Sequence, residues 1–132
     1  MNGLGPVLAT ASEELYRQVN PNFVQGDMLT SQVFDATRKD QGLLSVTRSS
    51  KTTAKDAFER FLARQCRSLG VVAVTVAEIG QVGLKAHDDV LPEEEAHAVI
   101  DFTRKSEGDA RRARKQLTIM AQARGWRYRP AA

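Results

Sequence analysis

The segment TTAKDAFERFLARQCRSLGVVAVTVA, residues 52–77, carries the strongest structural pattern in the chain and decides the fold. Thr53 is a suitable N-cap, and Asp56 follows three residues later as in an approximate capping box, so we predict a helix over 53–69. Gly70 is the residue type expected just after a helix C-terminus. The apolar run at 71–77 then predicts a buried strand, because such runs are typical of strands that are central in a sheet or covered on both faces.

The apolar positions of this helix recur at spacings of three and four residues, which places them on one face: Ala54, Ala57, Phe58, Phe61, Leu62, Cys66 and Leu69. We expect this face and the strand at 71–77 to form the centre of the core. Phe61 would then be fully buried, and Phe61→Ala would cost about 3–5 kcal/mol of stability. Cys66 is interpreted as a small core residue.

Working outward, alternating or β-branched apolar segments bounded by turn residues predict four more strands, at 15–19, 28–34, 43–48 and 97–102. A second main helix is predicted from Ser106 to Gly125, with Asp109 in its first turn. A short helix is possible at 77–84, although two glycines weaken it. The polar segment 35–42 is predicted to be a loop, and residues 1–11 a loose N-terminal arm.

These elements predict an α+β fold in a single compact domain, residues 12–132. We expect a mixed β-sheet of about five strands, with two main helices packed on one of its faces. The length of 132 residues corresponds to one domain, and 42% hydrophobic residues suffice for a core. With a single cysteine, no internal disulfide can form, and the chain begins without the pattern of a secretory signal. No apolar run is long enough to span a bilayer, so we expect a cytoplasmic protein that does not bind membranes.

Charge is distributed unevenly along the chain. Residues 102–132 contain nine Lys and Arg but two acidic residues, whereas residues 1–101 contain ten basic and fourteen acidic residues. The C-terminal segment therefore carries a charge of +7 and the rest −4. Such asymmetry indicates a basic surface on one part of the molecule. The acidic stretch at 87–95 is a second candidate surface.

The C-terminal helix is amphipathic, and its basic residues lie opposite its apolar face. That pattern is typical of an ordinary solvated face, but an apolar residue, Ile119, falls among the cations. The tail then alternates aromatic and basic residues, which suits a protein interface or the stacking of nucleic-acid bases. We therefore expect a non-catalytic adaptor that docks onto a protein partner, with nucleic-acid binding as the alternative. The predicted docking surface comprises Arg111, Arg112, Lys115, Ile119, Trp126, Arg127, Tyr128 and Arg129.

The sequence contains no recognisable catalytic motif. We therefore favour a function that is not enzymatic, and we expect no cofactor and no metal. His87 and His97 flank the acidic stretch, but without the spacing of a metal site. His97 and Asp101 would share a strand face at roughly 13 Å, too far for a direct pair, so each needs another partner. No serine lies in a nucleophile-elbow motif.

One enzymatic alternative uses the residue types of ADP-ribosyltransferases, which hold and cleave a dinucleotide. Arg17 lies in an early strand, Ser45 in a later strand, and Glu78 follows a third. Their spacing matches no defined motif. Whether Arg17, Ser45 and His97 line a ligand pocket stays open at this point.

Several segments resemble a set of small, uncharacterised bacterial proteins: LYRQV-x-P, SQ-x-F, LSV, GVVAVTVAE, HAVIDF and ARGW-x-YRP. The resemblance covers roughly residues 15–130. The chain departs from it at Asn20-Pro21, where the set has His-Pro, so no histidine acts there. The resemblance implies a bacterial origin and a single domain, and it implies no particular activity.

Overall fold

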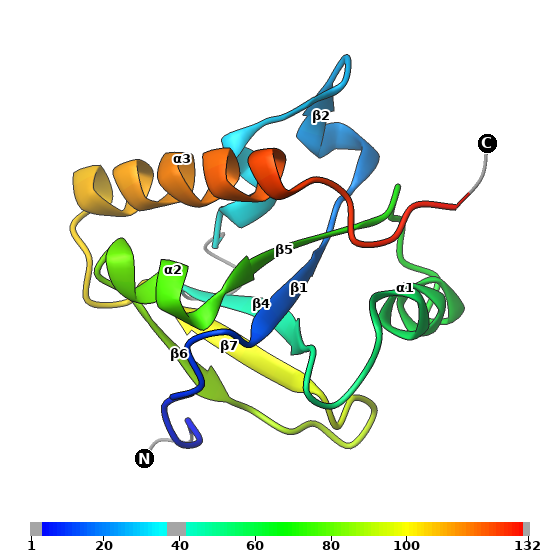
Figure 1. Ribbon diagram of the computed structural model, residues 1–132, viewed down its shortest axis with the longest axis horizontal. Helices are drawn as coiled ribbons and strands as arrows, with labels where there is room; N and C mark the ends of the chain where they lie inside the picture. The colour runs from blue at the N-terminus through cyan, green and yellow to red at the C-terminus, as the bar shows by residue number, and fades with distance from the viewer. Residues whose placement is uncertain (1–3, 37–41, 131–132) are drawn as a thin grey trace.

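A computed structural model describes residues 4–36 and 42–130, and its main feature is a five-stranded sheet (Figure 1). Every neighbouring pair in the sheet is antiparallel. In spatial order the strands are β5 (Val71–Thr75), β1 (Glu14–Gln18), β4 (Leu43–Arg48), β7 (His97–Asp101) and β6 (Lys85–Asp88). The α+β class and the single compact domain are therefore confirmed.

The sheet is antiparallel rather than mixed, and the position of β1 explains the difference. β4 and β5 are connected through helix α1 (Ala54–Ala63) and run in the same direction. β1 lies between them and pairs with both in the antiparallel sense. The β-α-β order in the sequence therefore produces no parallel neighbours.

The two main helices lie on opposite faces of the sheet, not on one face as expected. Helix α3 (Glu107–Arg124) packs through Ala113, Leu117 and Ala121 onto the main core. Helix α1 packs through Ala54 and Phe58 onto the other face, where it contacts Val71. Figure 1 shows α3 and α1 on different sides of β5.

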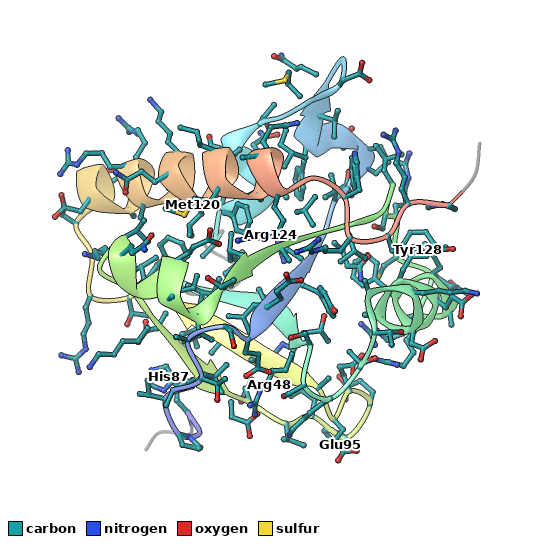
Figure 2. The ribbon with its side chains drawn as sticks, in the orientation of Figure 1. Arg48, His87, Glu95, Met120, Arg124 and Tyr128 are labelled. Carbon is teal, nitrogen blue, oxygen red and sulfur yellow. The ribbon has the colours of Figure 1, made fainter. Side chains whose placement is uncertain are left out.

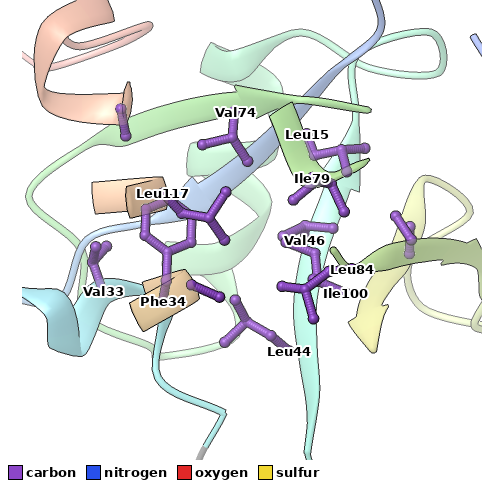
Figure 3. Close-up of a cluster of buried hydrophobic side chains, with 14 of the residues drawn as sticks. Leu15, Val33, Phe34, Leu44, Val46, Val74, Ile79, Leu84, Ile100 and Leu117 are labelled. Carbon is purple, nitrogen blue, oxygen red and sulfur yellow. The ribbon is translucent and has the colours of Figure 1, made fainter. Parts of the chain in front are cut away.

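The main core lies between the sheet and α3, and helix α2 (Val76–Gln81) closes it with Ile79 (Figure 3). Alternate residues of the strands enter this core, as the period of two requires. They include Leu15, Val74 and Leu44, each of which is fully buried. None of the helices in the described ranges has the length and apolar character needed to span a bilayer.

Residues 28–34 do not form the single strand that was predicted. Met28–Leu29 (β3) pairs with Val24–Gln25 (β2) in a small hairpin, and Ser31–Phe34 form a 3₁₀ helix, η2. Another 3₁₀ helix, η1 (Pro21–Phe23), precedes the hairpin. Val33 and Phe34 are consecutive and both fully buried. A strand would direct them to opposite faces, whereas a helical turn lets both enter the core.

Residues 5–8 of the predicted N-terminal arm are attached to the sheet edge rather than loose. The sequence did not predict strand β6. The backbone N–H groups of Gly5 and Leu8 donate hydrogen bonds of 3.0 and 2.9 Å to its carbonyl oxygens. Val7 forms an antiparallel bridge with His87, which lies beside this segment (Figure 2). A Cβ atom on Gly5 would lie 2.4 Å from the carbonyl oxygen of Asp88, so this approach requires glycine. Of the predicted loop at 35–42, residues 37–41 lie outside the described ranges.

Helix α1 ends at Ala63, six residues earlier than predicted. As a result, part of its predicted apolar face is not buried. Gln65 adopts a positive φ of 63°, which stops the helix. Ala54, Ala57 and Phe58 are buried as expected. Phe61, however, is half-buried, and Leu62 and Cys66 are exposed, so neither Phe61 nor Cys66 is a core residue.

This distribution predicts different costs for the two phenylalanines of α1. Phe58→Ala removes a side chain that is 5% exposed and should lower the free energy of unfolding by about 3 kcal/mol. Phe61→Ala should cost less than about 2 kcal/mol, because solvent already reaches its ring. Urea denaturation followed by circular dichroism measures both values. Equal costs for the two variants would contradict this account of α1.

Candidate active site

The sheet opens between its central strand, β4, and the neighbouring strand β1. β1 pairs with β5 over five residue pairs, but its register with β4 covers two, Leu15 with Arg48 and Tyr16 with Thr47. Beyond these pairs the side chain of Arg17 fills the gap. Its Nε donates to the carbonyl oxygen of Val33 at 2.7 Å, and its Nη1 donates to the carbonyl oxygen of Ser45 at 3.0 Å. The guanidinium thus takes the place of ladder hydrogen bonds where the strands separate.

A cavity of about 70 Å³ lies at this gap, under helix α1. It has space for a few water molecules or one small functional group. Polar side chains converge on it from three strands, the helix and the loop before β7. The lining residues are Tyr16, Arg17, Gln18, Ser45, Val46, Thr47, Ala57, Phe61, Arg64, Glu94 and His97. Arg17, Ser45 and His97 therefore line one cavity.

The sheet register brings Ser45 and His97 together. Thr47 lies opposite His97 and Ser45 lies opposite Val99, so Ser45 and His97 are diagonal neighbours on the same face. The Oγ of Ser45 lies 3.0 Å from the Nε2 of His97. Ser45 is exposed, whereas the His97 side chain is 13% exposed. A hydroxyl that solvent and ligand can reach is thus hydrogen-bonded to a largely buried imidazole.

Asp89 fixes the other nitrogen of the imidazole. The Nδ1 of His97 lies 2.8 Å from the main-chain oxygen of Asp89 and 3.1 Å from its carboxylate Oδ2. Both of these atoms are acceptors, so Nδ1 carries a proton. In a neutral imidazole Nε2 is then the acceptor, and the hydroxyl of Ser45 donates to it. The hydrogen bonds therefore run from the Ser45 hydroxyl to His97 and from His97 to the main-chain oxygen of Asp89, with the Asp89 carboxylate beside the same nitrogen at 3.1 Å.

A buried ion pair borders the cavity on the α1 side. Glu94 is 7% exposed, and its carboxylate accepts from Arg60 Nε at 2.9 Å and Nη2 at 3.0 Å. Arg64 Nη1 lies 3.8 Å from the same carboxylate. Burial opposes ionisation of Glu94, but the hydrogen bond from Arg60 and the two positive charges outweigh it and lower its pKa. Glu94 is therefore ionised, and its ion pair with Arg60 connects α1 to the loop before β7.

Gln18 carries an unused hydrogen-bonding group at the cavity. Its Oε1 is buried and has no hydrogen-bond partner in the described part of the chain. Because an unpaired buried acceptor is costly, such a group is a reason to look for a ligand or a bound water. Gln18 lies on β1 next to Arg17, so this acceptor is located where the strands diverge.

Four of the predicted docking residues lie on the solvent face of α3. Arg111, Arg112 and Lys115 are exposed, and Ile119 is 68% exposed. Arg112 forms an ion pair with Asp109 one turn earlier. This half of the predicted surface is accessible in the structure.

The other four predicted residues belong to the tail after α3, which runs along the edge of β5. Val71 bridges Tyr128 through the backbone, and the Tyr128 ring lies 5.2 Å from that of Phe58. Trp126 packs against the main core, and the guanidinium of Arg129 lies 4.7 Å from its ring centre. Arg127 pairs with Glu14 through a hydrogen bond of 2.8 Å from Nε. All four thus have contacts within the molecule.

Much of the acidic stretch is also paired internally. Asp88 accepts from Arg48 at 3.1 Å, and Asp89 and Glu94 are engaged as described above. His87 contacts the carbonyl oxygen of Gly5 at 3.0 Å. No group of three or more metal-ligating side chains occurs within residues 4–36 and 42–130.

Glu78 does not join Arg17 and Ser45, as the ADP-ribosyltransferase alternative would require. It lies on α2, where it completes a capping box with Thr75 and pairs with Arg124 at 2.8 and 2.9 Å. Figure 2 shows Arg124 directed from α3 toward the sheet. Burial opposes ionisation of Glu78, but the hydrogen bond from Arg124 outweighs it and lowers the pKa of Glu78. Its role here is structural.

The sequence did not identify Asp89 as the partner of His97. It correctly required a partner other than Asp101, which accepts instead from Thr103. The available signal was the acidic stretch before the strand, but five carboxylates there were equivalent in the sequence.

Comparison of the chain with models of protein families, with curated proteins and with solved structures found no match.

The lowered pKa of Glu94 predicts a specific acid sensitivity. A carboxyl group whose folded pKa lies below its ordinary value of about 4.5 stabilises the fold above that pH, and this contribution is lost as pH falls through the folded pKa. Glu94→Gln should cost about 2 kcal/mol at pH 7, and the difference from the parent should shrink below about pH 4.5. Urea denaturation across pH 3–7 measures this, with exposed Glu95→Gln as the matched control. A difference that does not change with pH would contradict the assignment.

Proposed function

We propose that this protein is a serine-dependent hydrolase of a carboxylic ester or amide. The observation that carries the proposal is that Ser45 and His97, which line one cavity, are hydrogen-bonded, while the other nitrogen of His97 contacts the main-chain oxygen and the carboxylate of Asp89. Catalytic triads are recognised by geometry and not by position in the sequence, so the absence of an elbow motif is no obstacle. The proposal departs from the expectation of a purely non-catalytic protein.

Ser45, His97 and Asp89 each have a defined role in this mechanism. His97 Nε2 takes the hydroxyl proton as Ser45 Oγ forms a bond to the substrate carbonyl carbon. His97 then gives that proton to the leaving alcohol or amine, and the acyl group stays on Ser45. A water molecule attacks the acyl carbon, loses a proton to His97 and releases the acid, while Ser45 recovers its proton. Asp89 holds the imidazole orientation and stabilises the imidazolium.

Donors for the developing negative charge are available at the cavity. Arg17 is already hydrogen-bonded to the main-chain oxygen of Ser45, and the Gln18 amide and the Arg64 guanidinium line the same space. Such N–H groups stabilise an oxyanion most strongly where water is excluded.

The first test is covalent labelling with a fluorophosphonate, a probe of activated serines. Mass spectrometry should find the adduct on Ser45. His97→Gln should slow labelling at least about 100-fold, because general-base catalysis contributes that much or more. Asp89→Asn should slow it as well, because it removes the negative charge 3.1 Å from Nδ1 that stabilises the imidazolium, although the main-chain hydrogen bond remains.

Ser12→Ala, which changes an exposed serine away from the cavity, is the matched control and should label like the parent. Thermal denaturation of every variant separates loss of labelling from loss of folding. If folded parent protein shows no adduct, or labels equally on several serines, the proposal is wrong.

A second candidate function is docking onto a protein partner through the solvent face of α3. The exposed Ile119 among Arg111, Arg112 and Lys115 favours it, because an apolar side chain surrounded by cations suits a partner with an acidic rim. The tail residues Trp126 to Arg129 support this surface by anchoring the end of α3 to β5. Nucleic-acid binding by the same cations is the alternative.

This candidate is tested by tagged purification from the native host, with and without nuclease. A protein recovered in near-equal amounts should resist nuclease and disappear with the triple variant Arg111→Glu, Arg112→Glu and Lys115→Glu. Recovered nucleic acid, with binding that falls steeply between roughly 50 and 200 mM salt, would support the alternative. If neither is recovered, the basic face of α3 is an ordinary solvated surface.

A further inference from the structure

The cavity at Ser45 continues into a larger one. The second cavity has a volume of about 350 Å³ and shares Arg17, Gln18 and Phe61 with the first. Its other lining residues come from the segment after β1 and from the segment after α1: Asn20, Phe23, Cys66 and Arg67. The two cavities therefore adjoin at Gln18, and together they are called the groove here, with Ser45 at one end and Arg67 at the other. Its volume is in the range of small-molecule sites, whereas that of the first cavity alone is not.

The larger part of the groove has apolar walls. Phe61 and Phe23 are both half-buried, and Phe23 packs on its inner side against the main core. Phe61 is the residue whose burial the helix pattern predicted and the fold leaves incomplete. Two accessible aromatic rings beside one cavity favour an aliphatic or aromatic portion of a ligand, which would exclude water from both.

The charge of the groove is positive at its far end. The residues lining the second cavity include Arg17 and Arg67 but no carboxylate. Arg67 is exposed and forms no ion pair with any of the described residues. At the near end the negative charge of Glu94 is already balanced by Arg60 and Arg64. An anionic group on the ligand thus has a partner at Arg67.

The junction of the two cavities is marked by Gln18, whose buried Oε1 lacks a partner among the described residues. A hydrogen-bond donor on the ligand, such as an amide N–H or a hydroxyl, would satisfy this acceptor once the Gln18 side chain turns its solvent-shielded Oε1 toward the cavity. Because Gln18 lines both cavities, the donor would lie between the reacting carbonyl and the apolar portion. The groove therefore favours a ligand that combines sufficient length, a hydrogen-bond donor and a negative charge.

From these features we infer that the substrate is an elongated acyl compound that ends in an anion. Its carbonyl lies at Ser45, its apolar chain or ring lies between Phe23 and Phe61, and its terminal carboxylate or phosphate pairs with Arg67. This inference rests on the proposed hydrolase function for the position of the carbonyl. The binding groove itself is tested separately from the chemistry.

The experiment compares two stable anilides, adipic acid monoanilide and hexananilide. They have acyl chains of six carbons and differ in a carboxylate at the chain end. Isothermal titration into the Ser45→Ala protein measures binding without turnover. The monoanilide should bind about tenfold more tightly, which corresponds to one accessible charge-assisted contact. Arg67→Gln should abolish this preference, and Arg111→Gln on the solvent face of α3 should preserve it.

The matching 4-nitrophenyl esters then test the reaction. With the parent protein, cleavage should depend on Ser45, and the adipate monoester should have a lower KM than the hexanoate ester. If both esters are cleaved equally and Arg67→Gln has no effect on binding, the inference fails while the hydrolase proposal stands. If the monoanilide binds through Arg67 but neither ester is cleaved, the groove stands and the hydrolase proposal fails. If neither anilide binds, the inference is overturned.

Discussion

The candidate site depends on one interaction, the insertion of the Arg17 side chain between two sheet strands. β1 is fully paired with β5 but separates from β4 after two residue pairs. Arg17 satisfies the carbonyl oxygens of Val33 and Ser45, which keeps the gap open without leaving these groups unpaired. The cavity lined by Ser45, His97 and Gln18 lies at this gap.

The uneven charge of the chain is largely resolved inside the molecule. Arg124 pairs with Glu78, Arg127 with Glu14, and Arg114 lies 3.8 Å from Asp35. These contacts tie α3 and the tail to β1, α2 and the segment after η2. Some cations of the basic segment, which the sequence suggests is a binding surface, therefore form ion pairs within the molecule. Arg111, Arg112 and Lys115 remain exposed on the outer side of α3.

The short length of α1 connects the fold to the groove. A helix that continued to residue 69 would place the end of its apolar face over the sheet. Because the helix stops at Ala63, Phe61 is left half-covered, and the segment that follows carries Cys66 and Arg67 to the groove wall. An incomplete core on this face therefore provides an apolar surface for a ligand.

The sequence by itself determined the helix starts at Thr53 and Ser106, the strands near 15–19, 43–48, 71–77 and 97–102, and the α+β class. These features depend on capping and periodicity, which act over a few residues. Only the tertiary structure decided the strand order, the two-sided placement of the helices and the helical turn at Val33 and Phe34. It alone joined Ser45, His97 and Asp89, because their meeting depends on the β4–β7 register and on a loop that returns to β7. Local patterns carry no information about which distant segments pair.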